Sequence, residues 1–433
     1  MNRITIWIVA IIVVISAGFF GWYQPKMRAQ EDAASAALAA EQAAAEAAAE
    51  AEAAALAEAN MIKIGIILGF TGPLESITPA MGAGAEMAIA EVNAAGTLLG
   101  GSAVTAIRAD STCIDAAAAT AAAERLVTSD GVHAIMGADC SGVTGAILQN
   151  VARPNGIVMI SPSATSPGLS TAEDDGLFFR TAPSDARQGV VMTQILMDRG
   201  INVVALTYTN NDYGKGLADS FEAAFIEAGG TVTISAAHED GKADYSAEVG
   251  ALASAGGEVL VVAGYTDQGG KGIIQASLDS GAFDTFVLPD GMVGQQLVDD
   301  IGDALNGSFG QFPGTDSQGA EMFQAMATEA GFDGTGAFAP ESYDAAALIM
   351  LSMAAAGSSA SADIKDHVMD VANAPGEEIF PGELAKAIEI LAAGGDIDYV
   401  GATAVELIGA GESAGNYREI EIGDGAINTV RFR

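Results

Sequence analysis

The chain has 433 residues, half of them hydrophobic, which allows a large core and two or more domains. Asp and Glu number 56 against 18 Lys and Arg, and the net charge of −38 argues against binding to nucleic acid or to an anionic membrane surface. With two cysteines and three histidines, the sequence also lacks the donors of an ordinary zinc site.

The first segment, residues 1–29, is apolar and aromatic. Ile4–Tyr23 carries no charge over about 20 residues, the length that a helix needs to span a bilayer. Trp7 and Trp22 lie near its two ends, as is typical of membrane interfaces. We expect a retained membrane anchor here. The alternative is a cleaved signal peptide, with Ile4–Ile15 as its apolar core and Ser16-Ala17-Gly18 as the cleavage site.

Residues 30–60 are almost purely alanine with regularly spaced glutamate. Alanine is the best helix former. Leu38 and Leu56 are the only large apolar residues of this segment, so it offers no apolar stripe to bury. The composition therefore predicts a solvated helical stalk, about 45 Å long at 1.5 Å per residue.

From Met61 onward, apolar runs typical of strands alternate with Ala-rich amphipathic runs typical of helices. The expected strands are Ile62–Leu68, Val104–Ala109, Ala134–Met136, Val158–Ile160, Asn202–Thr207, Thr231–Ala236, Glu258–Ala263 and Thr285–Leu288. The expected helices include Ala83–Ala95, Ala116–Thr128, Gly189–Arg199, Gly214–Ala228 and Gly269–Ser280. This alternation predicts parallel sheets with crossover helices. Because eight such units exceed one ordinary sheet, we predict two α/β lobes, each with a doubly wound, mainly parallel sheet.

Two loops of small and hydroxyl residues follow expected strands. They are Gly137–Gly142 and Ile160–Pro167. In an open parallel sheet, the loops at the carboxyl ends of strands form the ligand crevice. Ser141 precedes an amphipathic run and can cap a helix whose free N–H groups attract an anion. Either loop alone could be an ordinary turn, but together they indicate a binding cleft with a seat for a carboxylate.

Three further residues lie at strand ends in the second half of the chain. Tyr213 and Tyr265 each follow an expected strand, and Asp290 follows Thr285–Leu288. Each could be a turn residue. Together they would place two aromatic rings and a carboxylate opposite the anion seat, an arrangement that suits a zwitterionic ligand.

The sequence contains no convincing catalytic motif. Gly411-Glu412-Ser413-Ala414-Gly415 matches the G-x-S-x-G nucleophile elbow, but no histidine follows His367 to serve as its base. We interpret this motif as a glycine-rich turn. The prediction is a protein that is not an enzyme, with no catalytic residue, no metal and no cofactor.

The two cysteines, Cys113 and Cys140, lie near expected strand ends within one βαβ unit. They could be buried free thiols. We interpret them as a disulfide, which implies an oxidising compartment.

These motifs carry a family resemblance that extends from Ile62 to about Arg433. The matching stretches are Gly72-Pro73, Ala85 with Ile89, Asp110–Cys113, Cys140-Ser141, Ile160–Thr165, Arg180–Pro183 and Asp212–Gly216. Through them the chain resembles the periplasmic leucine/isoleucine/valine-binding proteins, the substrate-binding components of branched-chain amino-acid ABC transporters. The resemblance implies a type I periplasmic binding fold, in which two hinged lobes close over the ligand.

The resemblance also implies a set of ligand-binding residues. In the first lobe, Ser141, Ser163 (through its backbone) and Thr165, with Ala164 between them, would hold the α-carboxylate. The second lobe would contribute Tyr213, Tyr265 and Asp290, with Asp290 taking the α-ammonium. Cys113 and Cys140 would form the family's disulfide.

This chain departs from the family at two positions of the implied site. The family usually places Glu at the position of Asp290, and it tends to carry an aromatic residue near Ile77. These differences concern ligand distance and side-chain specificity.

The expected organisation is an anchor or signal segment (1–29), a stalk (30–60) and a bilobed ligand-binding domain (61–433). Within that domain we assign lobe 1 to about 61–182 and 311–340, lobe 2 to about 183–310 and 341–400, and a C-terminal extension to 401–433. The predicted function is capture of a branched-chain or related small amino acid or amide, and its delivery to an ABC permease and its ATPase.

The alternative function is a receptor-type module that senses a small carboxylate or amide. The expected location is the periplasm, tethered to the inner membrane through Ile4–Tyr23, or free after signal cleavage.

Overall fold

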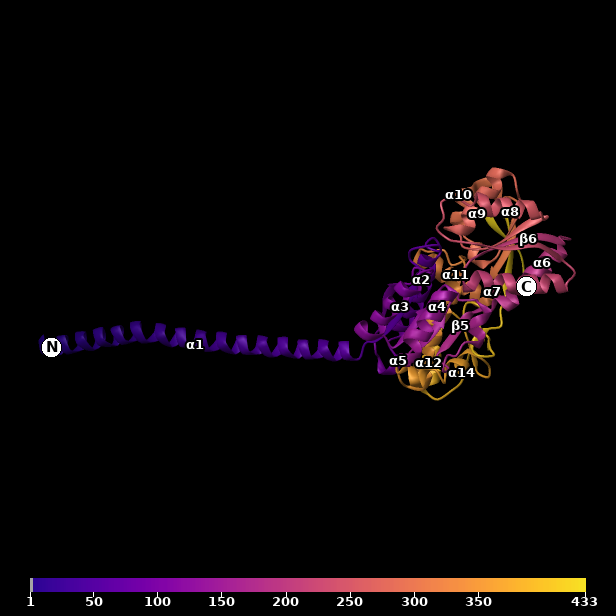
Figure 1. The fold of residues 1–433 in the computed structure, drawn as a ribbon. Coiled ribbons are helices and arrows are strands. Elements are labelled where there is room, and N and C mark those ends of the chain that lie inside the picture. Colours follow the sequence, from indigo (N-terminus) through magenta and orange to yellow (C-terminus); the bar gives the residue numbers. More distant parts are fainter. Residues whose placement is uncertain (1–2) are drawn as a thin grey trace. The chain divides into compact units, whose positions relative to one another are not determined.

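The computed structural model describes the backbone of residues 3–433, and their side chains apart from those of residues 3–9, 11 and 52–59. The chain divides into two compact units, Met1–Met61 and Ile62–Arg433. Figure 1 shows the course of the chain through both.

The first unit is a single helix, α1 (Arg3–Ala59), of 57 residues with Pro25 inside it. The Ala/Glu-rich segment is helical as far as Ala59. The ammonium of Lys26 lies 3.7 Å above the ring of Trp22, and Phe19 stacks on Tyr23.

The predicted transmembrane anchor Ile4–Tyr23 is not supported. Within residues 3–433, no helix combines the length and the apolar character that crossing a bilayer requires. The side chains of residues 4–9 and 11 lie outside the described part of the chain. The described run that remains, Ile12–Tyr23, is shorter than the roughly 20 apolar residues of a spanning helix.

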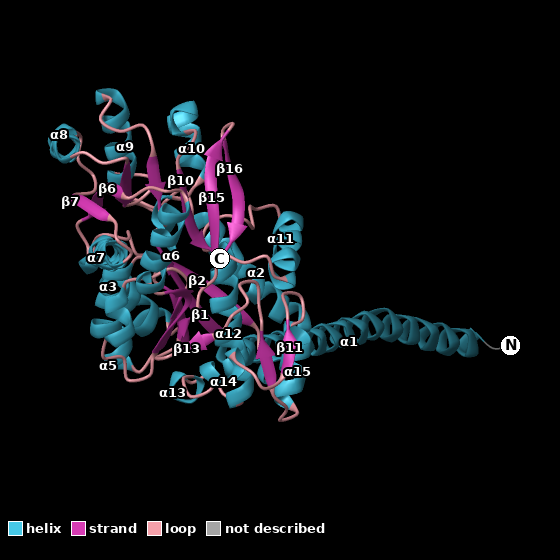
Figure 2. Cartoon of the chain, turned by 90° about the vertical axis from the view of Figure 1, so that its right-hand side faces the viewer, coloured by secondary structure: helices cyan, strands magenta, loops and turns pink. Residues whose placement is uncertain are grey.

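The second unit contains two seven-stranded, mainly parallel sheets (Figure 2). The first has the order β13-β14-β5-β4-β3-β1-β2. Its strands are β1 (Ile62–Leu68), β2 (Val104–Asp110), β3 (Ala134–Gly137), β4 (Val158–Ser161), β5 (Phe178–Pro183), β13 (Leu407–Ile408) and β14 (Glu412–Ser413). The second has the order β16-β15-β10-β9-β8-β6-β7. Its strands are β6 (Val203–Thr209), β7 (Thr231–His238), β8 (Val259–Ala263), β9 (Phe286–Leu288), β10 (Phe309–Pro313), β15 (Tyr417–Gly423) and β16 (Ala426–Phe432).

Helices connect the parallel strands of each lobe. In the first half of the domain they are α2 (Thr78–Ala95), α3 (Ala116–Arg125), α4 (Ser141–Ile147) and α5 (Arg153–Asn155). The second lobe has α6 (Asp185–Asp198), α7 (Asp212–Glu227), α8 (Ser246–Ala255), α9 (Gly269–Ser280) and α10 (Gln295–Ile301). Side-chain oxygens cap several of them: Asp115 accepts from the N–H groups of Ala117 and Ala118 at α3, and Asn211 accepts from Gly214 N–H at α7.

The chain passes between the two sheets three times. The passages follow β5, β10 and β14, each of which leads to a strand or helix of the other lobe. This topology confirms the two α/β lobes, each with a mainly parallel sheet, that the sequence predicts. All eight expected strands are present, and β1 and α9 begin and end at the predicted residues.

The later part of the chain is distributed differently from the expected domain boundaries. Residues 341–400, expected in lobe 2, begin in α12 (Ala339–Ala356), which packs on α2 and on β3–β5 of the first lobe. Because α12 is apolar and buried on nearly every face, it can only lie inside a core. Gly84 of α2 permits the close approach, since a Cβ there would lie 2.4 Å from the carbonyl oxygen of Ala339.

The remaining elements after β10 complete the two lobes. They are α11 (Gln318–Ala330), α13 (Ser361–Ile364), α14 (Val368–Ala372), β11 (Glu377–Ile379), α15 (Leu384–Ala392) and β12 (Ile397–Tyr399). Residues 401–433, expected as an extension, instead supply edge strands to both sheets: β13 and β14 to the first, and the β15–β16 hairpin to the second (Figure 2).

An ion-pair cluster fastens the C-terminal hairpin to the second lobe. The carboxylate of Glu419, only 3% exposed, accepts from Nε of Arg431 (2.9 Å) and Nε of Arg433 (2.7 Å). Nη2 of Arg199 lies 3.3 Å from its other oxygen. Burial alone would raise the pKa of Glu419, but the two hairpin arginines outweigh it and hold this pKa below its usual value.

We predict that Glu419→Gln lowers the free energy of unfolding by about 2 kcal/mol, because it removes the buried counter-charge shared by Arg431 and Arg433 and leaves them only the exposed Asp198. The matched control is Glu421→Gln, in the same strand, whose side chain is 47% exposed and pairs with Arg199 alone. Its expected effect is below about 0.5 kcal/mol. Urea denaturation of the two variants at pH 7 makes the comparison; equal losses would show that the buried cluster contributes no more than a surface pair.

Candidate functional site

The residues singled out from the sequence lie at the carboxyl ends of strands from both sheets. Ser141 begins α4 after β3, and Thr165 follows β4. Tyr213 lies in the first turn of α7 after β6, Tyr265 follows β8, and Asp290 follows β9. All five are at most 4% exposed. The parallel topology places these loops at the ends of the sheets where ligands bind in this class of fold.

On the first lobe, the polar groups of the two loops are partly used within the chain. The hydroxyl of Ser141 accepts from Ser166 N–H (3.1 Å), which leaves its own proton free to donate. Oγ1 of Thr165 is buried without a hydrogen-bond partner. The hydroxyl of Ser163 donates to the carbonyl of Asp139, and its N–H points to Ser161 Oγ (3.4 Å).

A buried carboxylate and a disulfide brace these loops. Asp139 accepts from Gly69 N–H (2.8 Å) and from the hydroxyl of Ser111 (2.7 Å), so it joins the loops that follow β1, β2 and β3. Its pKa is raised because burial outweighs these hydrogen bonds. Cys113, two residues after Ser111, and Cys140, directly after Asp139, form a disulfide. Since both sulfurs are spent in that bond, the trio Cys113, Asp139 and Cys140 is no thiolate metal site.

On the second lobe, two tyrosines and an aspartate form a connected group. The hydroxyl of Tyr213 donates to Oδ1 of Asp290 (2.7 Å), and Gly291 N–H donates to the same oxygen (2.8 Å). The rings of Tyr213 and Tyr265 stack with centroids 5.2 Å apart, and Asn211 Nδ2 donates to the hydroxyl of Tyr265. These contacts fix Asp290 through one oxygen and leave its second oxygen available.

Asp185, the first residue of α6, connects the two groups. Its N–H donates to the carbonyl of Thr165 (2.8 Å), and its carboxylate oxygens form no hydrogen bond of ordinary geometry. Burial and the neighbouring Asp290 raise the pKa of Asp185 well above its usual value, whereas Arg180 and the nearby hydroxyl of Thr165 act in the opposite direction. Burial also raises the pKa of Asp290. Two buried carboxylates close together favour a cation between them.

The two lobes touch along the rim of this site. Ser76 N–H of the first lobe donates to Oδ2 of Asp267 (2.9 Å), and Asp267 N–H donates to the carbonyl of Pro73 (3.1 Å). Next to this reciprocal pair, Ile77 lies against Gly294: a Cβ at Gly294 would be 3.3 Å from the Ile77 side chain and 3.4 Å from that of Thr266. Asp267 directly follows Tyr265 and Thr266 in the sequence. The residue that contacts the first lobe and the candidate binding residue Tyr265 therefore belong to one short segment.

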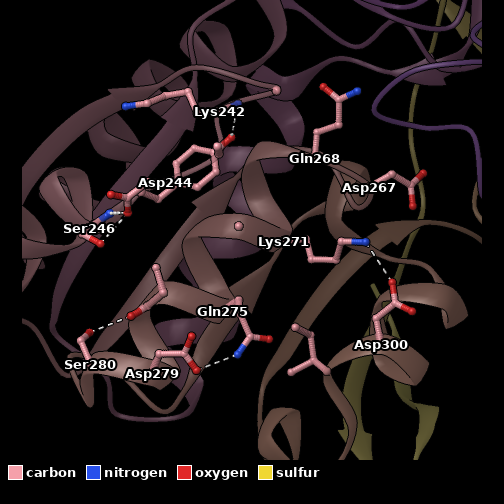
Figure 3. A pocket seen from close by; sticks show the side chains of 16 residues that line it. Lys242, Asp244, Ser246, Asp267, Gln268, Lys271, Gln275, Asp279, Ser280 and Asp300 are labelled. Atoms are coloured by element: carbon pink, nitrogen blue, oxygen red, sulfur yellow. Dashed lines mark hydrogen bonds and ion pairs between the residues drawn. The ribbon is translucent and has the colours of Figure 1, made fainter.

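A separate groove of about 880 Å³ lies on the second lobe, between the loop that precedes α8, α9 and the end of α10 (Figure 3). Lys271 pairs with Asp300 (2.9 Å), and the side-chain amide of Gln275 donates to Asp279 (2.8 Å). Asp267, which also lines the groove, is the residue that contacts the first lobe. Because these polar groups already have partners and the walls of the groove are largely exposed, we assign no ligand to it.

Sequence reasoning missed four residues of this region: Asp139, Asp185, Asp267 and Arg180. Arg180 begins the segment Arg180–Pro183, and Asp185 follows it. This segment comes soon after the loop that follows β4, and that short separation in the sequence was the available signal that both residues lie near the site. The partners of Asp139 and Asp267 lie 70 and 191 residues away in the sequence, and no local pattern shows those contacts.

Comparison with known proteins shows the family to which the chain belongs. The family model described as periplasmic binding protein matches residues 61–378. Leu/Ile/Val-binding protein homolog 1 of Brucella abortus (strain 2308) is 33% identical over 288 residues, which cover 65% of this chain and 74% of the relative.

Solved structures share the fold. A branched-chain amino acid transporter substrate binding protein from Streptococcus pneumoniae, in complex with isoleucine, aligns with a TM-score of 0.70 at 22% identity over 86% of this chain and 99% of its own. An ABC transporter solute binding protein from R. palustris, in complex with benzoate, gives 0.69 at 18% over 86% and 96%. At these identities the alignments show the fold alone.

We predict that Cys113 and Cys140 are joined in the purified protein. They close a loop of about 28 residues, and such a cross-link stabilises by roughly 3–4 kcal/mol in the chain-entropy model. Thiol labelling of denatured, unreduced protein should find no free cysteine, and reduction should release two. Two labelled thiols before reduction would contradict the disulfide and the oxidising compartment inferred from it.

Proposed function

The chain belongs to the family of periplasmic binding proteins and, within it, to the Leu/Ile/Val-binding proteins, and from this premise we propose that it captures a free amino acid between its lobes. The single observation that supports this class of ligand is that buried hydrogen-bond donors and buried carboxylates lie in the same site. Ser141 and Thr165 offer hydrogen-bond donors, whereas Asp290 and Asp185 offer carboxylates.

The carboxylates distinguish an amino acid from a plain carboxylic acid. A ligand such as benzoate, which the R. palustris protein holds, would satisfy the donors but would leave Asp290 and Asp185 buried without a counter-charge. An uncompensated buried carboxylate costs several kcal/mol. An α-ammonium between them removes that cost. A small aliphatic side chain, as in the isoleucine of the S. pneumoniae complex, suits the neighbourhood of Ile77 and Gly294.

We further propose that the lobes close on the ligand and that the closed form delivers it to an ABC permease and its ATPase. Stacked Tyr213 and Tyr265 would cover the ligand from the second lobe. The Ser76–Asp267 and Asp267–Pro73 hydrogen bonds would hold the lobes together. The disulfide supports a periplasmic location. For export we propose the cleaved signal peptide, Ile4–Ile15 followed by Ser16-Ala17-Gly18.

The experiment that tests the ligand class is a thermal-shift panel of amino acids, amides and small carboxylic acids on the full chain. A true ligand at 100 times its Kd stabilises the protein by about 2.7 kcal/mol. We expect shifts from small aliphatic amino acids and none from benzoate. A shift from benzoate alone would overturn the assignment.

We predict that Asp290→Asn weakens the binding of such an amino acid at least about 30-fold, because removing one partner of a buried charge pair costs 2 kcal/mol or more. The control is Asp284→Asn, an exposed aspartate just before β9. Isothermal titration of the two variants makes the comparison. Equal affinity for Asp290→Asn and the wild type would mean that the ligand has no ammonium at this position.

We predict that Asp267→Ala speeds ligand dissociation about tenfold and leaves association unchanged, because a hydrogen bond to a carboxylate contributes about 1.5 kcal/mol to the closed form only. Asp279→Ala is the control, because Asp279 is an exposed aspartate near the end of α9 whose side chain pairs with Gln275 of the same lobe. Stopped-flow measurements give both rates. If Asp267→Ala dissociates at the wild-type rate, the contact does not hold the lobes closed.

A further inference from the structure

A fully buried arginine stands behind the carboxylate end of the proposed site. Arg180 of β5 is 1% exposed. Its Nη1 donates to the carbonyls of Ala164 (2.9 Å) and Ser166 (3.0 Å), on either side of Thr165. Its Nη2 donates to the hydroxyl of Ser170 (2.7 Å) and to the carboxylate of Glu412 (2.5 Å). Both protons of each terminal nitrogen are therefore spent within the chain, so these nitrogens cannot also bind a ligand.

The bonds from Arg180 determine how the loop faces the cleft. In a trans peptide the C=O and the following N–H point in opposite directions. Because Arg180 holds the carbonyl of Ala164, the N–H of Thr165 is turned away from Arg180. Asp185 N–H holds the carbonyl of Thr165 in the same manner, and Ser166 N–H is turned toward Ser141 Oγ.

The result is a loop that presents the two donors of Thr165. Within the part of the chain that the structure describes, Thr165 N–H has no hydrogen-bond partner, whereas the N–H groups on both sides are occupied. The hydroxyl of Thr165 forms no hydrogen bond of ordinary geometry, but it lies close enough to Asp185 to lower the pKa of that carboxyl. Two adjacent donors on one residue fit the two oxygens of a carboxylate. Their direction depends on the guanidinium that holds the peptide before them.

The counter-charge of Arg180 comes from the far end of the sequence. Glu412, from β14, is the second residue of the G-x-S-x-G stretch that the sequence assigns to a turn. β14 pairs with β5, with Glu412 beside Arg180, and Gly411 accepts the N–H of Arg180 (2.9 Å). The hydroxyl of Ser170 also donates to Glu412, which closes a triangle of Arg180, Glu412 and Ser170. Without Glu412, the buried guanidinium would lose the one carboxylate that it pairs with directly, and its hold on the loop would weaken.

We propose that Glu412 is a positioning residue for ligand binding: through Arg180 it orients the Ala164–Ser166 loop so that the N–H and hydroxyl of Thr165 face the ligand's carboxylate. The inference rests on the proposed amino-acid function and adds a residue that does not touch the ligand. It also gives the G-x-S-x-G stretch a role that involves no nucleophile.

The test uses Glu412→Gln in the full chain, with Glu406→Gln as the control. Both substitutions remove one negative charge from the same C-terminal segment, but Glu406 is exposed. The first readout needs no ligand: hydrogen exchange of the peptide that spans residues 162–169. We expect the amides of this loop to exchange at least tenfold faster in Glu412→Gln than in the control. Unchanged exchange would overturn the proposal.

The second readout is titration with L-leucine and with L-leucinamide, which lacks the carboxylate. For Glu412→Gln we expect leucine to bind at least tenfold more weakly and leucinamide to change less than threefold. Losses by the same factor for both would mean a general disturbance of the cleft and would overturn the positioning role. If the wild type binds neither compound, the proposed ligand fails, and the exchange readout still decides the role of Glu412.

A milder variant covers the case in which Glu412→Gln does not fold. Ser170→Ala keeps both charges and removes only the hydroxyl that bridges them. We expect the amides of the loop to exchange about threefold faster and leucine to bind about threefold more weakly, with no comparable loss for leucinamide. Wild-type exchange and affinity in Ser170→Ala together would count against the triangle.

Discussion

The two lobes bury polar side-chain atoms that have no hydrogen-bond partner among the described residues. The free-energy cost of burying these atoms is the main constraint on the region where the lobes meet. Thr165 Oγ1, Thr266 Oγ1 and both oxygens of Asp185 are buried without hydrogen bonds. Each such group costs about 1–3 kcal/mol, and more when charged. The two hydrogen bonds around Asp267 return only about 1 to 1.5 kcal/mol each. On the proposed function, a ligand with matching groups would supply the missing partners and so favour contact between the lobes.

Scarcity of cations shapes how this acidic chain is stabilised. With 18 basic residues against 56 acidic ones, self-repulsion is strong at low salt. Several arginines each contact two or more partners. Arg180 neutralises Glu412 and holds a loop, while Arg431 and Arg433 both bind Glu419 and Asp198. Salt screens the repulsion between exposed carboxylates more than it screens these partly buried ion pairs. We therefore expect these ion pairs to stabilise the fold over a wide range of salt concentration.

The sequence predicted the elements whose signal is local. An apolar run gives β1 its bounds without any knowledge of its neighbours, and hydroxyl-rich loops after β3 and β4 mark the site. Strands such as β5 and β10 were not predicted, because Pro183 and Pro313 at their ends and mixed polarity disguise them. The division of residues 341–433 between the lobes depends on pairings across more than 200 residues, as between β14 and β5. For the same reason, Ser141 and Asp290 were predicted from local pattern, whereas the partnership of Arg180 with Glu412 was not.

The hydrogen bonds of Asp290 explain how a short acid can be held rigidly at the position where we propose that the ammonium binds. Tyr213 and Gly291 both bind Oδ1, so the carboxylate is held at a fixed angle and its second oxygen is directed by geometry rather than by side-chain length. The same hydroxyl of Tyr213 accepts from Gly291 N–H (3.2 Å), which ties the aromatic lid to the loop that carries the acid. A shorter side chain on this rigid support leaves more room beside it. Asp185 interacts electrostatically with Asp290, because both carboxylates are buried near each other. In the proposed site, selectivity for an ammonium over a neutral group would therefore be a property of the pair, set by α6 and the loop after β9, and a simple acid would gain nothing from it.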